Sequence, residues 1–315
     1  MYTNPIKFST ILPVLAVFVF ILLNISSCGL FDKELKQDEH MANFRRQMGR
    51  VEDSLRSHKD RIKAYMTIIE HINTDESLIT PRKKNLLLVE CNILISNEFF
   101  DVENYNKAID YTNVVISLEP TLAKGYYSRG CIYQIMGQDS LALKDYDIAL
   151  GFNPDFVDVY YNRGIIHEDN GDYDLALADY NKAIKLNPSY IANVYNNRGN
   201  TYLAKLVVDK AIEDYDKVIS IDSTNIKAYI NRAGAFILQN KPEKALADCN
   251  KAIALDSSSV YAYNKRAVTY EASKMYDQAL LDYQRILQLD PFNKQGTNTE
   301  AKAAIRRVRV LMKKK

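Results

Sequence analysis

The sequence predicts an all-α fold built as an array of helical hairpins, and two periodic features carry this prediction. A small residue follows an arginine about every 34 residues, and a second small residue keeps the same interval, which is typical of stacked two-helix repeats. The first set is Gly130, Gly164, Gly199, Ala233 and Ala267, and the second is Ala142, Ala176, Ala211, Ala245 and Ala279. One step in each set is a single residue longer than the others.

The other recurring residue types have mechanical reasons. Two antiparallel helices cross closely only where both side chains are small, so the two small residues mark the crossing. Aromatic residues one turn further along each helix fill the volume around that crossing. Proline cannot continue a helix, and it recurs where the second helix must end. These positions are Pro120, Pro154, Pro188 and Pro291, with the turn formers Ser223 and Ser257 in two other units.

This pattern resembles the tetratricopeptide repeat family, which implies a right-handed α-solenoid of helical hairpins. Tyrosine stands where the family usually has tryptophan, and arginine replaces the family's leucine, in five units. The tyrosines are Tyr126, Tyr160, Tyr195, Tyr229 and Tyr263. We expect six units: 89–122, 123–156, 157–191, 192–225, 226–259 and 260–293. The third is one residue longer, and we place that residue in the connection before Gly199.

Residues 1–27 are interpreted as a lipoprotein signal peptide. Ile11–Leu23 is an unbroken apolar run. It is shorter than the roughly 20 residues that a membrane-spanning helix needs. The small residues before Cys28 resemble the lipobox of bacterial lipoproteins, which implies cleavage after residue 27 and a lipid on the Cys28 thiol. An uncleaved helical anchor reaching Phe31 is the alternative. Residues 28–36 then form a lipid-anchored linker.

The lipoprotein interpretation implies a location in the bacterial cell envelope, on the outer membrane or the periplasmic face of the inner membrane. Several acyl chains, such as palmitate, are enough for stable anchoring, and no other cofactor is expected. Removal of residues 1–27 takes away Lys7 and no acid, which leaves 40 basic against 39 acidic side chains. This balance argues against a nucleic-acid partner. Cys91, Cys131 and Cys249 are interpreted as small buried hydrophobic residues.

Residues 37–88 are expected to form one long amphipathic helix and a connector that ends near Pro81. Apolar side chains recur there at steps of three and four, as in a heptad seam. One interpretation is a homodimer contact through 41–72 or a spacer, and the other is a helix packed along the first repeats. The seam is Met41, Phe44, Met48, Val51, Leu55, His58, Ile62, Tyr65, Ile69 and Ile72.

Residues 294–315 are expected to form a basic capping helix, because a solenoid needs a cover over its last apolar face. Ile305, Val308, Leu311 and Met312 share one side of this helix. The terminal run 313–315 consists of three lysines, which could also meet an anionic lipid.

The sequence contains little that points to catalysis, so we expect a binding protein and no enzyme. His167 and Glu168 begin like a zinc protease motif, but Gly171 stands where its second histidine belongs. The acidic stretch 169–174 lacks the ligand alternation of a calcium loop and is more simply a turn. We therefore expect no catalytic residues and no metal site.

A partner is expected in a groove lined by the first helix of each hairpin. The family binds extended peptides or a helix there, and amide and tyrosine side chains suit peptide backbones. The alternative is that the repeated asparagines only support hairpin stacking. The expected groove residues are Tyr127, Tyr161, Asn162, Asn196, Asn197, Asn200, Lys227, Asn231, Tyr261, Asn264 and Lys265.

One known binding mode of the family fits poorly. In the carboxylate clamp, which grips a partner's C-terminus, Asn200 and Asn231 match the two asparagines, and Lys265 stands in place of the arginine. Asn196 and Tyr261 replace the two lysines. Most of the positive charge is therefore missing. The favoured function is a membrane-anchored scaffold or adaptor for a protein partner. The alternative is a surface glycan-binding lipoprotein that uses tyrosine faces and asparagine side chains.

Overall fold

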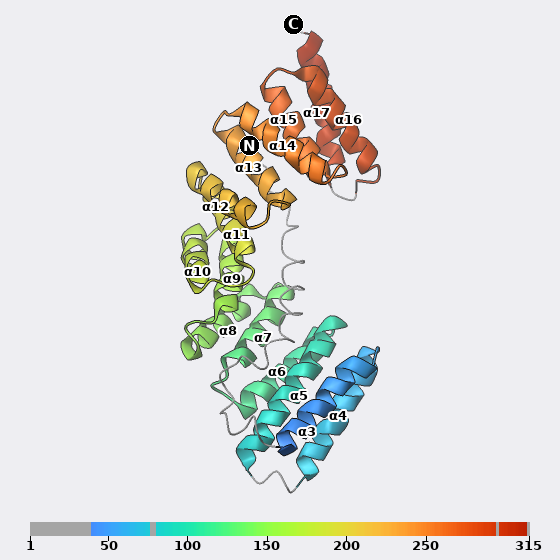
Figure 1. Cartoon of the computed structure of the whole chain (residues 1–315), viewed down its shortest axis with the longest axis vertical. Coiled ribbons are helices and arrows are strands. Elements are labelled where there is room, and N and C mark those ends of the chain that lie inside the picture. Colours follow the sequence, from blue (N-terminus) through green and yellow to red (C-terminus); the bar gives the residue numbers. More distant parts are fainter. Residues whose placement is uncertain (1–38, 76–79, 294–295, 314–315) are drawn as a thin grey trace. The chain divides into compact units, whose positions relative to one another are not determined.

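The computed structural model describes residues 39–75, 80–293 and 296–313, and every regular element in these ranges is an α-helix (Figure 1). Backbone contacts divide the chain into two compact units, 1–159 and 160–315. The expected signal peptide 1–27, Cys28 and the linker 28–36 lie outside the described residues. None of the described helices is both long enough and apolar enough to cross a bilayer.

The N-terminal unit contains a helical pair followed by two hairpins. The first helix of the first hairpin, α5, is extended at its N-terminal end and begins at Pro81, after the N-cap residue Thr80. The helices are α3 (Glu39–Ser54), α4 (His58–Thr74), α5 (Pro81–Asp101), α6 (Tyr105–Leu118), α7 (Ala123–Ile135) and α8 (Asp139–Phe152).

The single long helix expected over 41–72 is wrong, because the chain forms two helices, α3 and α4, with a break at 55–57. Ser57 has extended backbone angles and acts as the N-cap of α4. Arg61 donates hydrogen bonds to the carbonyl oxygens of Leu55 and Arg56, at 2.9 and 3.3 Å. These carbonyls follow the end of α3 and have no intrahelical partner, so Arg61 stabilises the break.

Both halves of the predicted seam pack into one core with α5. Met41, Met48, Tyr65 and Ile72 are buried there, together with Leu87 of α5. The spacing of three and four continues across the break because α3 and α4 both pack an apolar face against α5. The seam is therefore occupied within the unit, which favours a packed helical pair over a coiled-coil contact through 41–72.

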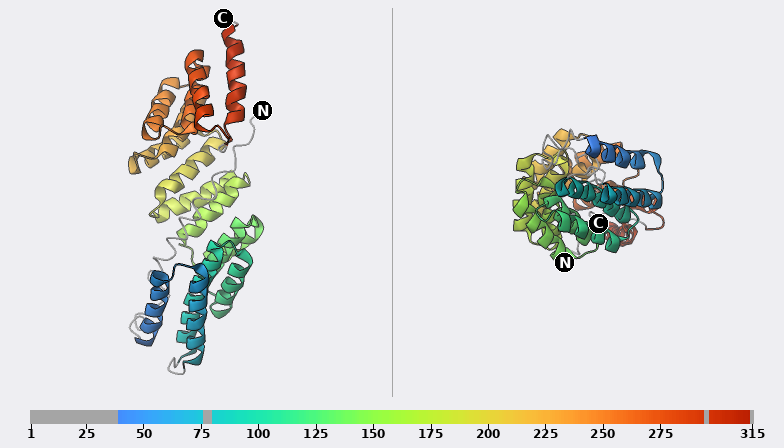
Figure 2. Two further views of the ribbon diagram at one scale, coloured as in Figure 1. Left: turned by 90° about the vertical axis from the view of Figure 1, so that its right-hand side faces the viewer. Right: turned by 90° about the horizontal axis from the view of Figure 1, so that it is seen from below.

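The C-terminal unit repeats the hairpin and ends in a single covering helix. Its helices are α9 (Val157–Asp169, which begins just before the unit boundary), α10 (Tyr173–Leu186), α11 (Ile191–Ala204), α12 (Val208–Ile221), α13 (Ile226–Leu238), α14 (Pro242–Leu255), α15 (Val260–Ala272), α16 (Tyr276–Leu289) and α17 (Asn298–Lys313). Figure 2 shows α17 beside α16 at the red end of the chain. Ile305 and Val308 of α17 are buried against the last hairpin, as the sequence predicts for a cap.

The helix ends follow the residues that predict them. Pro120, Pro154, Pro188 and Pro291 each lie just beyond the last residue of a second helix. The extra residue of the third unit was expected in a connection, but it is helical: α11 has 14 residues where α9 and α13 have 13. It extends α11 at its N-terminal end, since Gly199 lies eight residues after the start of α11 and Gly164 seven after the start of α9.

At the crossing of three hairpins a glycine lies against an aromatic ring. A Cβ atom added at Gly130, Gly164 or Gly199 would lie 2.7 or 2.8 Å from a ring carbon of Tyr146, Tyr180 or Tyr215. These three tyrosines are fully buried. Glycine is therefore required by the close approach of the ring. Cys91, Cys131 and Cys249 are buried, as expected.

An arginine–aspartate pair joins the two helices of each regular hairpin. In each pair Nε and Nη2 of the arginine donate to the two carboxylate oxygens of an aspartate 16 residues later, at 2.6 to 2.9 Å. The aspartates are at most 5 % exposed. The pairs are Arg129–Asp145, Arg163–Asp179, Arg198–Asp214, Arg232–Asp248 and Arg266–Asp282. This fork geometry is the strongest arrangement for a buried carboxylate.

The same guanidinium groups also link consecutive hairpins. The Nη1 atoms of Arg129, Arg198 and Arg266 donate to Asn113, Asn181 and Asn250 on the preceding second helix, at 2.6 or 2.7 Å. Arg232 pairs with Asp216 in the equivalent place, at 2.5 Å. Each of these arginines therefore connects three helices.

We expect Arg232→Ala to lower the free energy of unfolding by about 3 kcal/mol, because it leaves the buried Asp248 carboxylate without its cation. Arg232→Lys keeps the charge but loses the two parallel hydrogen bonds, so it should still destabilise. Urea denaturation followed by circular dichroism measures both.

The control for this prediction is Lys205→Ala, which removes an ion pair to the exposed carboxylate of Asp174. Its effect should stay below about 1 kcal/mol. The double variant Arg232→Ala/Asp248→Ala should recover part of the loss. An Arg232→Ala protein as stable as Lys205→Ala would contradict the structural role of the pair.

We expect Gly199→Leu to destabilise the protein by about 3 kcal/mol through overpacking against Tyr215. Gly234→Ala is the matched change in α13, where the new Cβ atom would meet Lys265 Nζ at 3.5 Å, an ordinary contact. It should stabilise by up to about 1 kcal/mol, because alanine favours the helix. Thermal melts of the two variants measure both effects. Equal melting temperatures would show that the contact with the Tyr215 ring does not restrict the size of residue 199.

Candidate functional site

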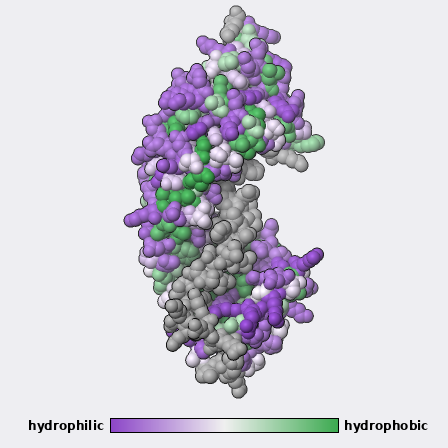
Figure 3. Space-filling view, in the orientation of Figure 1, coloured by the Kyte–Doolittle hydropathy of each residue, from purple (hydrophilic) through white to green (hydrophobic). Residues whose placement is uncertain are grey.

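Three first helices of the C-terminal unit lie side by side and carry most of the predicted groove residues. α13 contacts α11 on one side and α15 on the other. On the face of this unit visible in Figure 3, hydrophilic residues predominate and hydrophobic residues lie in small patches among them.

Asparagine side chains from α11 and α13 form one hydrogen-bonded group. Asn231 Nδ2 lies 3.1 Å from Asn196 Oδ1 and 3.1 Å from Asn200 Oδ1. Asn197 joins through a 3.5 Å contact with Asn196. We call Asn196, Asn197, Asn200 and Asn231 the amide surface; all four are partly exposed. It retains amide groups for a partner because one amide has two donors and an acceptor with two lone pairs.

Hydrogen bonds with tyrosine hydroxyls position two asparagines of the amide surface. Tyr215 OH on α12 donates to Asn200 Oδ1 at 2.8 Å, and Asn197 Nδ2 donates to Tyr161 OH at 3.2 Å. Both rings are buried. The amides are therefore positioned by fixed groups, which reduces the entropy that binding would cost.

Lys265 places a positive charge beside the amide surface. Its Nζ atom lies 3.5 Å from the position of a Cβ atom on Gly234, which places the ammonium beside α13. Burial lowers the pKa of the Lys265 ammonium below its usual value of 10.5. Among the described residues no carboxylate forms an ion pair with it. An acidic group of a ligand would supply that partner.

Three of the predicted groove residues are not on a surface, and their prediction as partner contacts is wrong. Tyr127, Tyr161 and Asn162 are 1, 2 and 1 % exposed. Tyr127 packs on Phe156 at a ring-centroid distance of 4.8 Å, and Tyr161 packs on Tyr190 at 5.3 Å. An aromatic residue in the following connection covers each ring, which the repeat pattern does not reveal.

The remaining predicted residues are accessible to different degrees. Lys227 is exposed, Tyr261 is 42 % exposed, and Asn264 is partly exposed. Asn200 and Asn231, which match the carboxylate clamp, are brought together. Asn196 and Tyr261 stand in place of its lysines, so this surface has one cation, Lys265, where the clamp has three.

A partly exposed glutamate, Glu168, is a site residue that the sequence reasoning did not assign. Tyr180 OH donates to Glu168 Oε2 at 2.7 Å. Burial raises the pKa of Glu168 to about 7, and the hydrogen bond from Tyr180 opposes this rise in part. The signal that could have indicated it is the fixed spacing between an acid on a first helix and a core tyrosine on the second.

The N-terminal unit contains one compact cluster of histidine and carboxylates among the residues described: His58, Glu98 and Asp101. His58 Nδ1 lies 2.6 Å from Glu98 Oε2, and Arg61 Nε donates to Glu98 Oε1 at 2.6 Å. Arg61 Nη2 is also 3.0 Å from His58 Nδ1. The guanidinium already neutralises Glu98 and would repel a metal ion, so this cluster joins α4 to α5.

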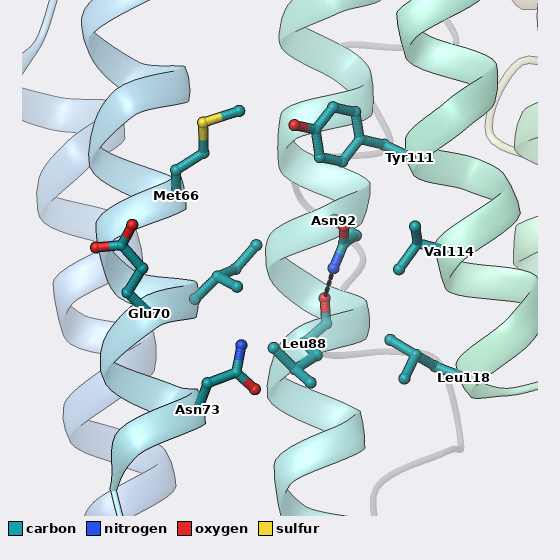
Figure 4. A pocket seen from close by; sticks show the side chains of 9 residues that line it. Met66, Glu70, Asn73, Leu88, Asn92, Tyr111, Val114 and Leu118 are labelled. Atoms are coloured by element: carbon teal, nitrogen blue, oxygen red, sulfur yellow. Dashed lines mark hydrogen bonds between the residues drawn. The ribbon is translucent and has the colours of Figure 1, made fainter.

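The same unit has a hollow of about 410 Å³ between α4, α5 and α6 (Figure 4). In the figure Met66, Glu70 and Asn73 approach it from one side, and Tyr111, Val114 and Leu118 from the other. Asn92 donates from Nδ2 to the Leu88 carbonyl at 2.7 Å, so its amide is partly used within α5. The hollow offers mainly apolar contacts and suits a peptide backbone less well than the amide surface does.

Known proteins share the repeat seen in this geometry. A model of the tetratricopeptide repeat matches residues 157–190, 226–259 and 260–293, and a second model of the same repeat matches 192–225. These ranges begin at the same residues as four of the units expected from the sequence. No curated protein sequence matches the chain.

Solved structures share the fold. The C-terminal part of a TPR repeat-containing protein from Cytophaga hutchinsonii superposes with a TM-score of 0.59 at 21 % identity, covering 83 % of this chain and 99 % of that one. PilF of Pseudomonas aeruginosa gives 0.59 at 15 % identity, with 70 and 98 % covered. YrrB, described as a TPR protein with an unusual peptide-binding site, gives 0.51 at 16 % identity, with 61 and 97 % covered.

The periodic small residues, the paired helices and the matching repeat models agree with one another. The chain belongs to the tetratricopeptide repeat family.

Proposed function

We propose that this protein is a scaffold that binds a partner protein in the bacterial cell envelope, tethered through a lipid on Cys28. Tetratricopeptide repeat proteins are generally interaction scaffolds and not enzymes. The binding site is the amide surface together with Lys265. The partner binds there through an extended peptide segment.

The hydrogen-bonded asparagines are the observation that carries this proposal. An extended peptide presents backbone donors and acceptors alternately, and an amide side chain can satisfy both. Asn196, Asn200 and Asn231 offer such groups on two neighbouring helices within hydrogen-bond distance of one another. YrrB, which shares the fold, is described as having a peptide-binding site.

Lys265 adds a preference for an acidic group on the ligand. A charge-assisted hydrogen bond in a partly buried place is about twice as strong as a neutral one. The ammonium would regain the stabilisation that burial removes when a carboxylate binds beside it. This gives the peptide a direction, with its acidic group toward α15.

Anchoring at Cys28 is supported by the apolar run Ile11–Leu23 and the small residues that precede the cysteine. The glycan-binding alternative has less support. Its tyrosine faces are largely in the core, since Tyr127, Tyr146, Tyr161, Tyr180 and Tyr215 are all buried.

We expect Lys265→Gln to reduce recovery of the partner at least tenfold after crosslinking of intact envelopes and affinity purification of the tagged protein. The loss of one charge-assisted hydrogen bond accounts for that factor. Quantitative mass spectrometry of the captured proteins measures it.

The matched control is Lys227→Gln, because Lys227 is exposed on the neighbouring helix α13. It should change recovery by less than about twofold. Recovery of no protein above background with the unmodified chain would contradict the scaffold function, and binding to purified envelope glycans would favour the alternative.

We expect the chain expressed in its native envelope to incorporate a palmitate analogue, and Cys28→Ser to abolish that label. Cys131→Ala changes a buried cysteine and should leave labelling intact. Click detection on a gel reads the label, and mass spectrometry reads the mature N-terminus. A labelled Cys28→Ser protein, or an N-terminus other than residue 28, would disprove the anchor.

A further inference from the structure

In three hairpins the core tyrosine of the second helix donates a hydrogen bond from its hydroxyl to a side chain of the first helix. The accepting residue lies 12 positions earlier in each case. The pairs are Tyr146 with Gln134, Tyr180 with Glu168 and Tyr283 with Glu271, at 2.7, 2.7 and 3.0 Å. The repeat therefore builds the same polar position several times, with either an amide or a carboxyl group.

The chain itself shows what the carboxyl form of this position accepts. Arg307 of α17 donates from Nε to Glu271 Oε1 at 2.7 Å and from Nη2 to Oε2 at 2.8 Å. The hydrogen bond from Tyr283 is retained at the same time. The guanidinium lowers the pKa of Glu271 below its usual value. This position thus accommodates a guanidinium fork beside the tyrosine hydroxyl.

Glu168 has the same tyrosine partner but no such cation. The residue that corresponds to Arg307 is Lys205, since the two occupy the same place in their units when counted from positions 294 and 192. The Lys205 ammonium instead pairs with Asp174 at 2.6 Å. Among the residues described, no lysine or arginine pairs with Glu168. Glu168 is a partly exposed residue, which leaves it open to a group from outside the chain.

We propose that Glu168 receives the guanidinium of an arginine in the peptide that the amide surface binds. This inference rests on the proposed function and adds a chemical requirement for the partner. The carboxylate offers two oxygens in the geometry that Glu271 presents to Arg307, and arginine matches that geometry better than lysine. The occupant is therefore an arginine side chain of a protein ligand.

The position of Glu168 connects it to the amide surface. The hydroxyl of Thr201 on α11 lies close enough to Glu168 to lower the pKa of its carboxyl group. Thr201 is next to Asn200 and one helical turn from Asn197 on the same helix. Glu168 is on α9 and Lys265 is on α15, with the amide surface on α11 and α13. The bound segment therefore carries a basic residue at one end and an acidic group at the other.

The charged and titratable groups around Glu168 set its response to pH. They are Asp169 and Tyr161 on α9, Tyr180 on α10 and Tyr215 on α12, with Thr201 as the neutral neighbour from α11. None of them is a cation. Binding of a guanidinium requires the ionised carboxylate, so the affinity should rise as pH increases through about 7.

The test uses the full chain labelled with carbon-13 in its glutamate carboxyl groups. The probe is N-acetylarginine amide, and N-acetylcitrulline amide is its uncharged twin. NMR titration should show the Glu168 midpoint shifting to lower pH with the arginine probe and staying in place with the citrulline probe. Glu168→Gln assigns the signal, and this variant should fold, because Gln134 occupies the equivalent position beside Tyr146.

A midpoint that does not move, or that moves equally with both probes, would overturn the inference. A higher midpoint in Lys205→Ala would also overturn it, because Lys205 would then supply the cation in solution. With the captured partner, Glu168→Gln should lower affinity at least tenfold and Asp169→Asn less than twofold. Capture of a partner that binds Glu168→Gln normally would leave the scaffold function standing and reject only the role of Glu168.

Discussion

The architecture depends on an ion pair between a partly buried arginine and a buried aspartate in each regular hairpin. Each guanidinium meets an aspartate of its own second helix with two parallel hydrogen bonds. Arg129, Arg198, Arg232 and Arg266 also reach the preceding second helix. Apolar contacts alone specify this geometry less strictly, because a carboxylate accepts the fork in few orientations. The ion pairs therefore fix both the pairing within a hairpin and its stacking on the one before.

In four hairpins a tyrosine at the crossing links this structural constraint to the candidate site. A small residue on the first helix lets the tyrosine ring of the second helix pack against it. The hydroxyl of that ring then reaches a polar side chain of the first helix. There the hydroxyl meets Gln134, Glu168, Asn200 or Glu271. Core packing and the positioning of the candidate site's polar groups use the same side chain, because a buried hydroxyl must find a partner. The polar groups of the site are held by the core.

The two ends of the repeats are covered in different ways. At the N-terminal side, the α3–α4 pair packs its apolar faces on α5 and is joined to it by Glu98 with Arg61 and His58. At the C-terminal side, α17 buries Ile305 and Val308 and pairs Arg307 with Glu271. Each cover combines apolar burial with an ion pair to the helix beneath. Repeat arrays need such covers because their terminal faces would otherwise expose core residues.

The sequence by itself determined the hairpins, their crossings, their proline ends and the covering helix, since these depend on residue types at a fixed period. It also contained the constant arginine–aspartate spacing, although only the fold shows that the two side chains meet. The tertiary structure alone decided the break at 55–57, the burial of Tyr127, Tyr161 and Asn162, and the separate environments of Glu168 and Glu271. Periodicity specifies which face of a helix is packed. The residue that covers a given side chain comes from a neighbouring helix or connection, so Tyr190 buries Tyr161 and Arg307 neutralises Glu271 for reasons that no local pattern contains.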